Sequence, residues 1–558
     1  MKPFTFLAYC CVTILKVHIL GNVLESKLVQ TLQGPVRGYR IPETDVYAFR
    51  SIPYATAPTG PNRFKAPLTP PNWTEPLDAI DKGIICPQPL IKALPALNKH
   101  MQEDCLITNI YVPNTNETKL PVAVSIHGGA FQIGYGDMLP TDKFTKNTNV
   151  ITVTFNYRLG AYGFLCLGTE SAPGNAGLKD QVSLLKWVKE NIESFGGNPN
   201  DITLMGCSAG GVSVELLMLS KSTDGLFNKV IPESGSSIGF ISIQQNPIET
   251  AIFNAKSLNF TNVDDLQALE EFYKSVPIEL LVFDDFWDSS NFAYSFIPCI
   301  EDPTSTDAII TDVPANIIMS GDYKKLPMLY GLTNMEGLNR FQYFELWKTR
   351  MNEDFSEFLP IDLHFNNEED KLNVIKSIKE FYFGDQQLDE KDLLGFIDYY
   401  TDTVFGHVML KATRLHVNAG HDKIYLYEYS YVDNQTPPLP NSEARGATHC
   451  SQTLAVWGVK MFSNPGDNPL GDHDPFHSTV RQLWSNFIKT GQPVPEGSPV
   501  PNWPPVGHNI SPHMSIGEKI ELKRGLLENR SRFWDEIYEK YYQVPVSPIL
   551  HSKTKTEL

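Results

Sequence analysis

A Gly-Cys-Ser-Ala-Gly pentapeptide at residues 206–210 joins the apolar run 202–205 to the amphipathic stretch 212–219. A G-x-S-x-G turn between a strand and a helix is the sequence form of a nucleophile elbow, in which the serine side chain stands clear of the sheet. The flanking glycines leave room for crowded backbone, and the helix N-terminus favours negative charge that develops during attack on a carbonyl. The pattern predicts Ser208 as a nucleophile, although glycine-rich turns without a catalytic task also occur in many α/β proteins.

A serine hydroxyl becomes a useful nucleophile only when an imidazole takes its proton and a carboxylate orients that imidazole. Where an elbow supplies the serine, the acid and then the histidine follow it along the chain. Glu336 follows the predicted strand 328–330, and His449 lies downstream of the predicted strand 424–427. Both therefore fall on the sheet edge that carries Ser208. With 13 histidines and 64 acidic residues, position alone leaves solvated glutamates and structural histidines open as alternatives.

A second segment of small residues, His-Gly-Gly-Ala-Phe at 127–131, follows the predicted strand 122–126. Small side chains there let backbone N–H groups approach a tetrahedral intermediate, and the N–H just after the nucleophile adds another donor. We therefore expect an oxyanion hole from the residues Gly128, Gly129, Ala130 and Ala209. Its position two strands before the elbow favours this interpretation over a glycine-rich loop without function.

These candidate residues need a sheet to position them, and the hydrophobic pattern predicts one. Apolar, β-rich runs alternate with helical periodicity, which is clearest between residues 178 and 192. Such alternation predicts an α/β fold with a large, mostly parallel central sheet flanked by helices. The stretch 249–402 is richer in acidic and aromatic residues, and we expect it to form insertions at the carboxyl edge of the sheet, walling a deep pocket.

Composition narrows the class of protein further. The 558 residues are 42% hydrophobic and 20% charged, which is ordinary for a globular chain. A formal net charge of −18 would repel nucleic acid and anionic membrane surfaces. We expect no nucleic-acid partner, no membrane span and a neutral or apolar small-molecule substrate; the sequence does not indicate an oligomeric state.

The first residues are typical of a secretory signal peptide, with Lys2 before the apolar run 4–15 and a small residue at Gly21. We expect a signal peptide at 1–21, one domain at 22–545 and a flexible tail at 546–558; a membrane anchor is the alternative for the leader. Asn-x-Ser/Thr sequons support passage through the secretory pathway. They lie at Asn72, Asn116, Asn259, Asn434 and Asn529, with a weaker one at Asn509 before Pro512.

Of the eight cysteines, two fall in the leader, and six belong to the predicted domain. Cys86 and Cys105 bracket a short loop, and in an oxidising compartment we expect them to form a disulfide worth about 3 kcal/mol. The remaining four lie in apolar or active-site contexts, where buried free thiols are expected. They are Cys166, Cys207, Cys299 and Cys450.

Taken together, the motifs of this chain resemble those of the type-B carboxylesterase and cholinesterase family of α/β-hydrolases, especially insect carboxylesterases. The resemblance covers nearly the whole predicted domain and rests on ordered motifs at 49–55, 63–64, 103–106, 156–160, 174–181 and 195–199. It implies a triad of Ser208, Glu336 and His449, with Gly129, Ala130 and Ala209 as oxyanion donors. It also implies that Cys86–Cys105 is the family's first disulfide and that Arg63 and Glu103 form a structural ion pair. Ser234 matches a serine that lies near the triad in this family.

Departures from the family pattern bear on the substrate. The position before the nucleophile is often glutamate in this family and is Cys207 here, and the loop 86–105 contains no aromatic residue to stack on choline. These differences exclude choline esters. Juvenile hormone esterases also resemble the chain but usually carry glutamine before the serine. Cys207 itself could be a second nucleophile or a redox switch; a packed thiol beside the triad is the interpretation we adopt. Glu233 stands where the family usually has glutamine.

The resemblance implies a carboxylic ester hydrolase that works through an acyl-enzyme on apolar esters of hormone, odorant, acetate or xenobiotic type, with no cofactor and no metal. The alternatives are a juvenile-hormone-type esterase and a non-catalytic, cholinesterase-like binding or adhesion protein. The chain ends Lys-Thr-Glu-Leu at 555–558, which resembles an endoplasmic reticulum retention signal. The expected location is therefore extracellular or the lumen of the endoplasmic reticulum.

Overall fold

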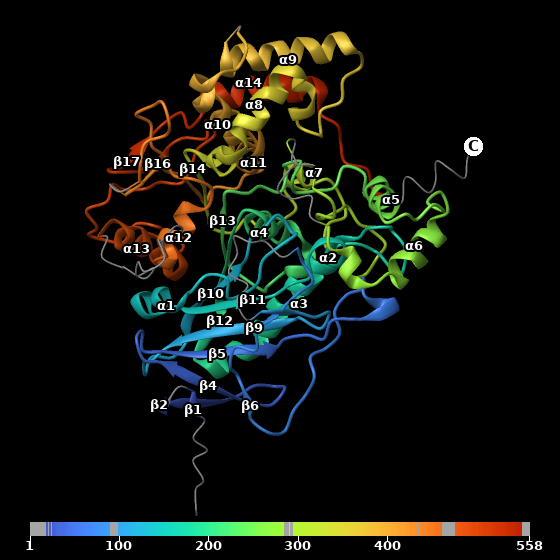
Figure 1. Cartoon of the computed structure of the whole chain (residues 1–558). Helices are drawn as coiled ribbons and strands as arrows, with labels where there is room; N and C mark the ends of the chain where they lie inside the picture. The colour runs from blue at the N-terminus through green and yellow to red at the C-terminus, as the bar shows by residue number, and fades with distance from the viewer. Residues whose placement is uncertain are drawn as a thin grey trace, which may run out of the picture.

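A computed structural model describes residues 18–19, 22–23, 25–89, 99–283, 290, 294–384, 386–433, 436–459 and 475–548. Within these residues one large sheet runs through the molecule (Figure 1), in the strand order β17-β16-β15-β14-β13-β12-β10-β11-β9-β5-β4-β3 with β6 beside β4. Its strands are β3 (Ser26–Gln30), β4 (Pro35–Ile41), β5 (Val46–Pro53), β6 (Leu77–Asp78), β9 (Ile107–Pro113), β10 (Leu120–Ile126), β11 (Ile151–Phe155), β12 (Gly197–Cys207), β13 (Lys229–Glu233), β14 (Met328–Thr333), β15 (Ile424–Tyr429), β16 (His513–Ile516) and β17 (Ile520–Lys523). Two short pairs lie apart from it: β1 (His18–Ile19) with β2 (Asn22–Val23), and β7 (Ile84–Ile85) with β8 (His100–Met101).

The centre of the sheet is parallel and its two ends are antiparallel. From β11 through β10, β12, β13, β14 and β15 to β16, each neighbouring pair runs in the same direction. The edges close with antiparallel pairs, β16 with β17 on one side and β11 with β9 on the other. The prediction of a large, mostly parallel sheet is confirmed.

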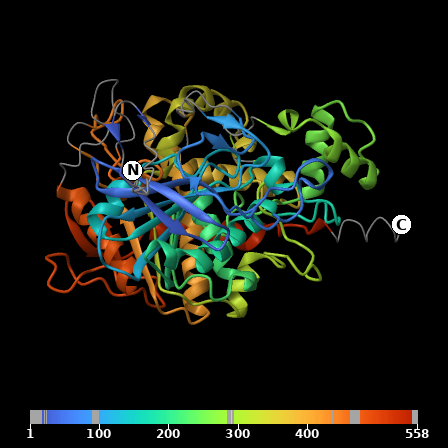
Figure 2. The same cartoon turned by 90° about the horizontal axis from the view of Figure 1, so that it is seen from below.

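Helices cover both faces of this sheet (Figure 2). They are α1 (Asp142–Thr148), α2 (Gly160–Phe164), α3 (Ala176–Asn191), α4 (Ala209–Leu219), α5 (Pro247–Ser257), α6 (Leu266–Ser275), α7 (Pro314–Ser320), α8 (Phe344–Glu353), α9 (Glu368–Phe383), α10 (Leu393–Thr401), α11 (His407–Asn418), α12 (Ser451–Trp457), α13 (Pro475–Thr490) and α14 (Glu528–Tyr541). The helices α3 and α4 pack on one face, and α13 packs on the other with α1 and α12 beside it.

The alternation of side chains along a strand explains why two apolar layers form. In β10, Val122 and Val124 belong to the core beneath α3 and α4, whereas Ala123 between them belongs to the core beneath α13. Successive side chains point to opposite faces of a strand, so a strand covered on both faces must be apolar throughout. The periodic apolar residues predicted between 178 and 192 are buried in α3 and the turn that follows it.

The predicted insertion 249–402 contributes helices that extend beyond the sheet. The helices α5 and α6 project from one side, at the right of Figures 1 and 2, and α8, α9 and α10 lie with α14 above β14 in Figure 1. The latter group has its own apolar core, rich in aromatic side chains such as Trp347, Phe396 and Trp534. This core packs closely against the segment that begins at Glu336. The approach is so tight that a Cβ on Gly337 would lie 2.3 Å from the carbonyl oxygen of Ile397.

The structure corrects the prediction of four free thiols. Cys86 and Cys105 form the expected disulfide, but Cys166 is bonded to Cys299 and Cys207 is bonded to Cys450. The last two pairs span 133 and 243 residues. The sequence alone did not reveal them because the partners lie far apart along the chain and come together only in the folded structure.

Candidate active site

Ser208 occupies a strained turn between β12 and α4. Its backbone has φ 61° and ψ −128°, a conformation that costs an L-residue of order 1–3 kcal/mol. The turn is tight because the backbones nearly touch: a Cβ on Gly210 would lie 2.2 Å from the carbonyl oxygen of Ile126, and one on Gly206 would lie 2.7 Å from the same oxygen. Only glycine fits at both positions, which is the physical content of the G-x-S-x-G pattern.

The segment predicted to form the oxyanion hole lies directly beside this turn. Strand β10 pairs with β12, although β11 separates them in the sequence, so the loop after β10 emerges next to Ser208. A Cβ on Gly128 would lie 2.7 Å from the carbonyl oxygen of Cys207 and 3.1 Å from Cβ of Ser208. Gly129 and Ala130 both have positive φ, at 109° and 52°, so the loop curls tightly at this point. Ala209 is the first residue of α4, immediately after the predicted nucleophile.

His127, which the sequence analysis placed in this loop without a role, supports its shape. Its ring stacks on Tyr157 with centroids 4.3 Å apart, and Nδ1 lies 2.9 Å from the carbonyl oxygen of Gly128. Burial lowers the pKa of His127 to about 4, so the imidazole is neutral at ordinary pH and Nδ1–H donates to that carbonyl. A neutral, stacked imidazole fixes the backbone of the loop that faces Ser208.

The predicted acid, Glu336, lies just beyond the end of β14 and is completely buried. Its Oε1 accepts a hydrogen bond from the backbone N–H of Thr333 at 2.7 Å and another from the hydroxyl of Ser234 at 2.6 Å. Ser234 in turn accepts from the side-chain amide of Gln452 at 2.9 Å. The family resemblance implied Ser234 at this place, whereas nothing in the sequence pointed to Gln452.

The other carboxylate oxygen of Glu336 contacts the predicted base. Oε2 lies 2.5 Å from Nδ1 of His449, whose side chain is 16% exposed. Because a carboxylate only accepts, Nδ1 carries the proton and Nε2 keeps a free lone pair. Among the described residues, Nε2 of His449 and Oγ of Ser208 have no hydrogen-bond partner.

Hydrogen bonds and a ring contact hold the loop that carries His449 in place. The N–H of Ala447 donates to the side chain of Asn334 at 2.9 Å, and the carbonyl of Ala447 accepts from the N–H of Met335. Phe405 packs its ring on the imidazole with centroids 4.4 Å apart. Phe405 lies in a π-helical segment, Asp402–Gly406, between α10 and α11; such segments are frequent at functional sites, but the sequence gives no sign of this one.

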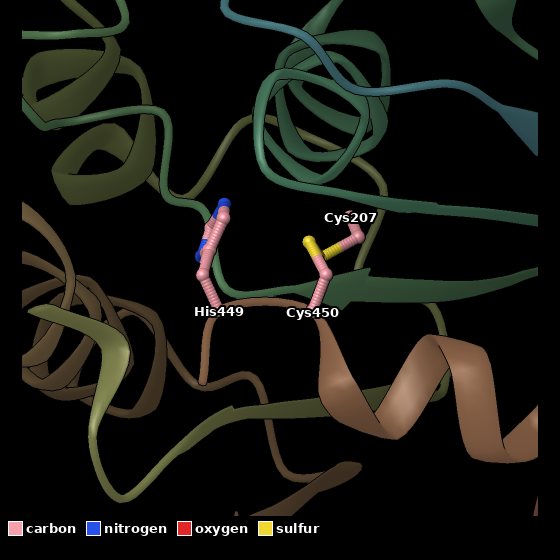
Figure 3. A group of neighbouring side chains, drawn as sticks. All are labelled: Cys207, His449 and Cys450. Atoms are coloured by element: carbon pink, nitrogen blue, oxygen red, sulfur yellow. A yellow bond between two sulfur atoms is a disulfide. The ribbon is translucent and has the colours of Figure 1, made fainter. Parts of the chain in front are cut away.

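The disulfide Cys207–Cys450 joins the elbow that carries Ser208 to the loop that carries His449 (Figure 3). The two sulfurs and a ring nitrogen of His449 lie within 4.8 Å of one another, a spacing that a metal ion could use if the cysteines were thiolates. Since the sulfurs are bonded to each other, neither offers a thiolate ligand. The group is therefore a crosslink beside an imidazole. The sulfur of Cys207 lies within 4.8 Å of a ring nitrogen of His449, but the prediction of a packed free thiol there is wrong.

Glu233 is a completely buried carboxylic acid next to the elbow. Its carboxylate accepts hydrogen bonds from Thr453 at 2.7 Å, Trp484 at 3.0 Å and Tyr427 at 3.2 Å. Burial nevertheless raises the pKa of Glu233 to about 7, because three neutral donors do not replace bulk water around a charge. The backbone carbonyl of Glu233 accepts from the N–H of Ser208 at 2.9 Å, so this residue is directly attached to the elbow.

The fold and this arrangement define a hydrolase of the α/β class with a serine, a histidine and a glutamate at one sheet edge. The family model described as "Carboxylesterase family" matches residues 25–534. The chain belongs to the carboxylesterase family and is a carboxylesterase.

Three similar proteins place it within that family. Esterase FE4 of Myzus persicae is 32% identical over 508 residues, covering 86% of this chain and 87% of that protein. Neuroligin-2 of Mus musculus is 29% identical over an alignment that covers 93% of this chain and 68% of the neuroligin. A crystal structure of juvenile hormone esterase from Manduca sexta with OTFP covalently attached superimposes with a TM-score of 0.80 at 28% identity, covering 92% of this chain and all of that one.

Other residues singled out in the sequence have defined surroundings. Arg63 lies 3.4 Å from Glu103, as the family resemblance implied. The sequon residues Asn72, Asn116, Asn259, Asn509 and Asn529 are exposed, while Asn434 lies outside the described residues. Within the predicted tail, the N–H of Val546 donates to the carbonyl of Gln245 at 2.8 Å. None of the helices in the described part of the chain is long and apolar enough to cross a membrane.

Proposed function

We propose that the protein hydrolyses apolar carboxylic esters through an acyl-enzyme, with Ser208 as nucleophile, His449 as general base and acid, and Glu336 as the residue that orients the imidazole. The observation that carries the proposal is the 2.5 Å contact between the buried Glu336 carboxylate and Nδ1 of His449. The loop that carries His449 is joined by a disulfide to Cys207, the residue before Ser208. Within the described residues, this arrangement leaves one imidazole nitrogen without a partner and available for a proton.

The reaction would proceed in two half-reactions. His449 takes the proton of Ser208 as the hydroxyl attacks the ester carbonyl, and N–H groups of Gly129, Ala130 and Ala209 hold the negative oxygen of the intermediate. His449 then gives the proton to the departing alcohol. Water repeats the sequence on the acyl-enzyme and releases the acid.

The surroundings of Ser208 favour a neutral ester. The position before the nucleophile is held by a disulfide sulfur and carries no charge, so nothing there attracts a cationic alcohol. A polar cleft of about 470 Å³ between α1 and α13 contains none of the triad residues and is not part of this proposal. A juvenile-hormone-type ester is the second candidate, favoured by the structural likeness to the Manduca sexta enzyme over 92% of the chain.

Passage through the secretory pathway is part of the same proposal. Three disulfides among the described residues are typical of a protein that matures in an oxidising compartment. Exposed asparagines at four of the five main sequons are compatible with glycosylation. Glycan analysis of the natural protein separates the two locations: Golgi-processed glycans on most molecules would contradict retention in the endoplasmic reticulum.

The direct test is a Ser208→Ala variant assayed with p-nitrophenyl esters. We expect its kcat to fall by about a million-fold, as when the nucleophile of a serine hydrolase is removed. An organophosphate should label the wild-type protein at Ser208 and leave the variant unlabelled. A panel of acetate, methyl and longer acyl esters, together with a juvenile-hormone-type methyl ester, assigns the substrate class. A variant as fast as the wild type would refute the mechanism.

A further inference from the structure

We propose that the Cys207–Cys450 disulfide is a positioning crosslink for the ester hydrolysis proposed above, on which this inference rests. The bond joins the residue immediately before Ser208 to the residue immediately after His449. It therefore holds the nucleophile and the base in register across 243 residues of sequence. Its loss would impair the chemical step more than the binding of substrate.

The local geometry supports this role. The Cα atoms of the two cysteines lie 6.1 Å apart, and a ring nitrogen of His449 lies within 4.8 Å of both sulfurs. Figure 3 shows the disulfide bridging the end of β12 and the start of α12, with His449 on the same loop as Cys450. The covalent path from His449 to Ser208 therefore consists of the disulfide and the two peptide bonds that flank it.

Both ends of the bridge adjoin backbone that is costly to hold in place. Ser208, next to Cys207, has φ 61° and ψ −128°, and Cys450 itself has φ 63° in the left-handed region. Such conformations persist only when the surrounding structure fixes them. The bridge supplies that constraint to the elbow and to the histidine loop at the same time.

The other attachments of the histidine loop reach the elbow only indirectly, for example from Thr453 of α12 through the carboxylate and backbone of Glu233. In the described part of the chain, hydrogen bonds fasten it to the acid loop through Asn334 and Met335, and fasten α12 to Ser234 through Gln452. These contacts set the distance from His449 to Glu336. The disulfide is the direct bond from this loop to residue 207, so it sets the distance from His449 to Ser208.

The first test compares two double variants of the full chain. Cys207→Ser with Cys450→Ser removes the proposed crosslink, and Cys166→Ser with Cys299→Ser is the matched control. The control bridge is also long in sequence, and loop-closure stabilisation grows only with the logarithm of loop length, so both variants lose similar stability. Assays are run with purified, folded protein well below the melting temperature of both.

We expect kcat of the Cys207/Cys450 variant to fall about 10- to 100-fold, the effect of misplacing reacting groups by about 1 Å, while KM changes less than about threefold. The rate at which an organophosphate labels Ser208 should fall in parallel. The control variant should keep kcat within about twofold of the wild type. If both variants keep kcat, the bridge has only a stabilising role and the proposal is wrong.

A second measurement works on the natural chain and decides the question even where the variant does not fold. Cys450 is partly exposed, whereas the sulfurs of the other two disulfides belong to residues that are at most 1% exposed. A small dithiol should therefore reduce the Cys207–Cys450 bond first. One thiolate attacks a cysteine sulfur, the second thiol resolves the mixed disulfide, and two electrons pass from the dithiol to give two cysteine thiols and a cyclic disulfide.

Reduction should lower kcat to the level of the Cys207/Cys450 variant, and reoxidation should restore it. Alkylation and mass mapping identify which bond was cut. Full activity with Cys207 and Cys450 alkylated as free thiols would overturn the proposal. The oxidised wild-type protein and Ser208→Ala separate the two hypotheses: inactive oxidised protein contradicts the ester hydrolysis itself, whereas active protein that is insensitive to reduction contradicts only the positioning role.

Discussion

The part of the chain that the structure describes holds two Glu–His contacts, one of which leaves a ring nitrogen of the histidine without a hydrogen-bond partner. In the pair proposed to be catalytic, Glu336 holds Nδ1 of His449, and the imidazole is 16% exposed with its other nitrogen unpartnered among the described residues. In the second pair, Glu215 of α4 lies 2.8 Å from Nε2 of His416 in α11, and both side chains are completely buried. The residue types and the distances are similar.

What differs is the second ring nitrogen. Nδ1 of His416 lies 2.6 Å from the hydroxyl of Tyr323, so both nitrogens are occupied. Glu215 is also saturated, since its other oxygen accepts from the N–H of Ser237 at 2.6 Å and from the hydroxyl of Tyr330 at 3.3 Å. A closed network of this kind specifies packing. In the proposed mechanism the open nitrogen of His449 moves a proton, whereas the closed network around His416 has no free nitrogen to do so.

The largest effect is expected for Glu336→Gln. The amide keeps the shape of the side chain but no longer stabilises the imidazolium or enforces the tautomer with the proton on Nδ1. We expect kcat to fall by roughly a thousand- to ten-thousandfold, as when the acid of a comparable triad is replaced by an amide. Steady-state kinetics on p-nitrophenyl esters measure the effect, and a fall of less than about tenfold would contradict the assignment of Glu336.

The matched substitution in the closed pair, Glu215→Gln, should act on stability instead. Removing one partner of a buried Glu–His contact typically costs about 3–5 kcal/mol of unfolding free energy. Urea unfolding should show that loss, while kcat per folded molecule stays within about threefold of the wild type. A large fall in kcat with unchanged stability would show that the two pairs do not have separate roles.

The smallest effect is expected at Glu233, which adjoins the elbow but lies outside both pairs. Its pKa is raised by burial from 4.5 to about 7, so the folded state binds a proton more tightly than the unfolded state. The stabilisation from this proton is complete below about pH 4.5 and is lost as the pH rises through about 7, an effect of about 3 kcal/mol. Glu233→Gln does not titrate and should remove this part of the slope.

Unfolding free energies measured at pH 5 and pH 8 test the expectation. Part of the slope should remain in the variant, because burial also raises the pKa of Asp362 to about 7. If the wild type and Glu233→Gln lose equal stability between the two pH values, then Glu233 is already ionised in the folded state. Asp362→Asn provides the control for a buried carboxyl that contacts neither Glu–His pair in the described structure.

Local patterns in the amino-acid sequence were enough to predict the alternation of strands and helices, the elbow at Ser208 and the glycine loop at 128–130. Each of these is a local pattern: apolar periodicity fixes which faces are buried, and backbone crowding at Gly206 and Gly210 allows no side chain. Glu336 and His449 were chosen by family resemblance, since 64 acidic residues and 13 histidines gave position no power to select them.

The remaining features of the site depend on long-range contacts. The pairing of Cys207 with Cys450, the ring of Phe405 on His449 and the amide of Gln452 on Ser234 join segments whose approach depends on the order of strands in the sheet. No local propensity encodes such contacts, because hydrophobic pattern specifies which residues are buried but not which buried residues meet. The prediction of four free thiols was wrong for this reason: thiol and disulfide are equally compatible with burial, and only proximity distinguishes them.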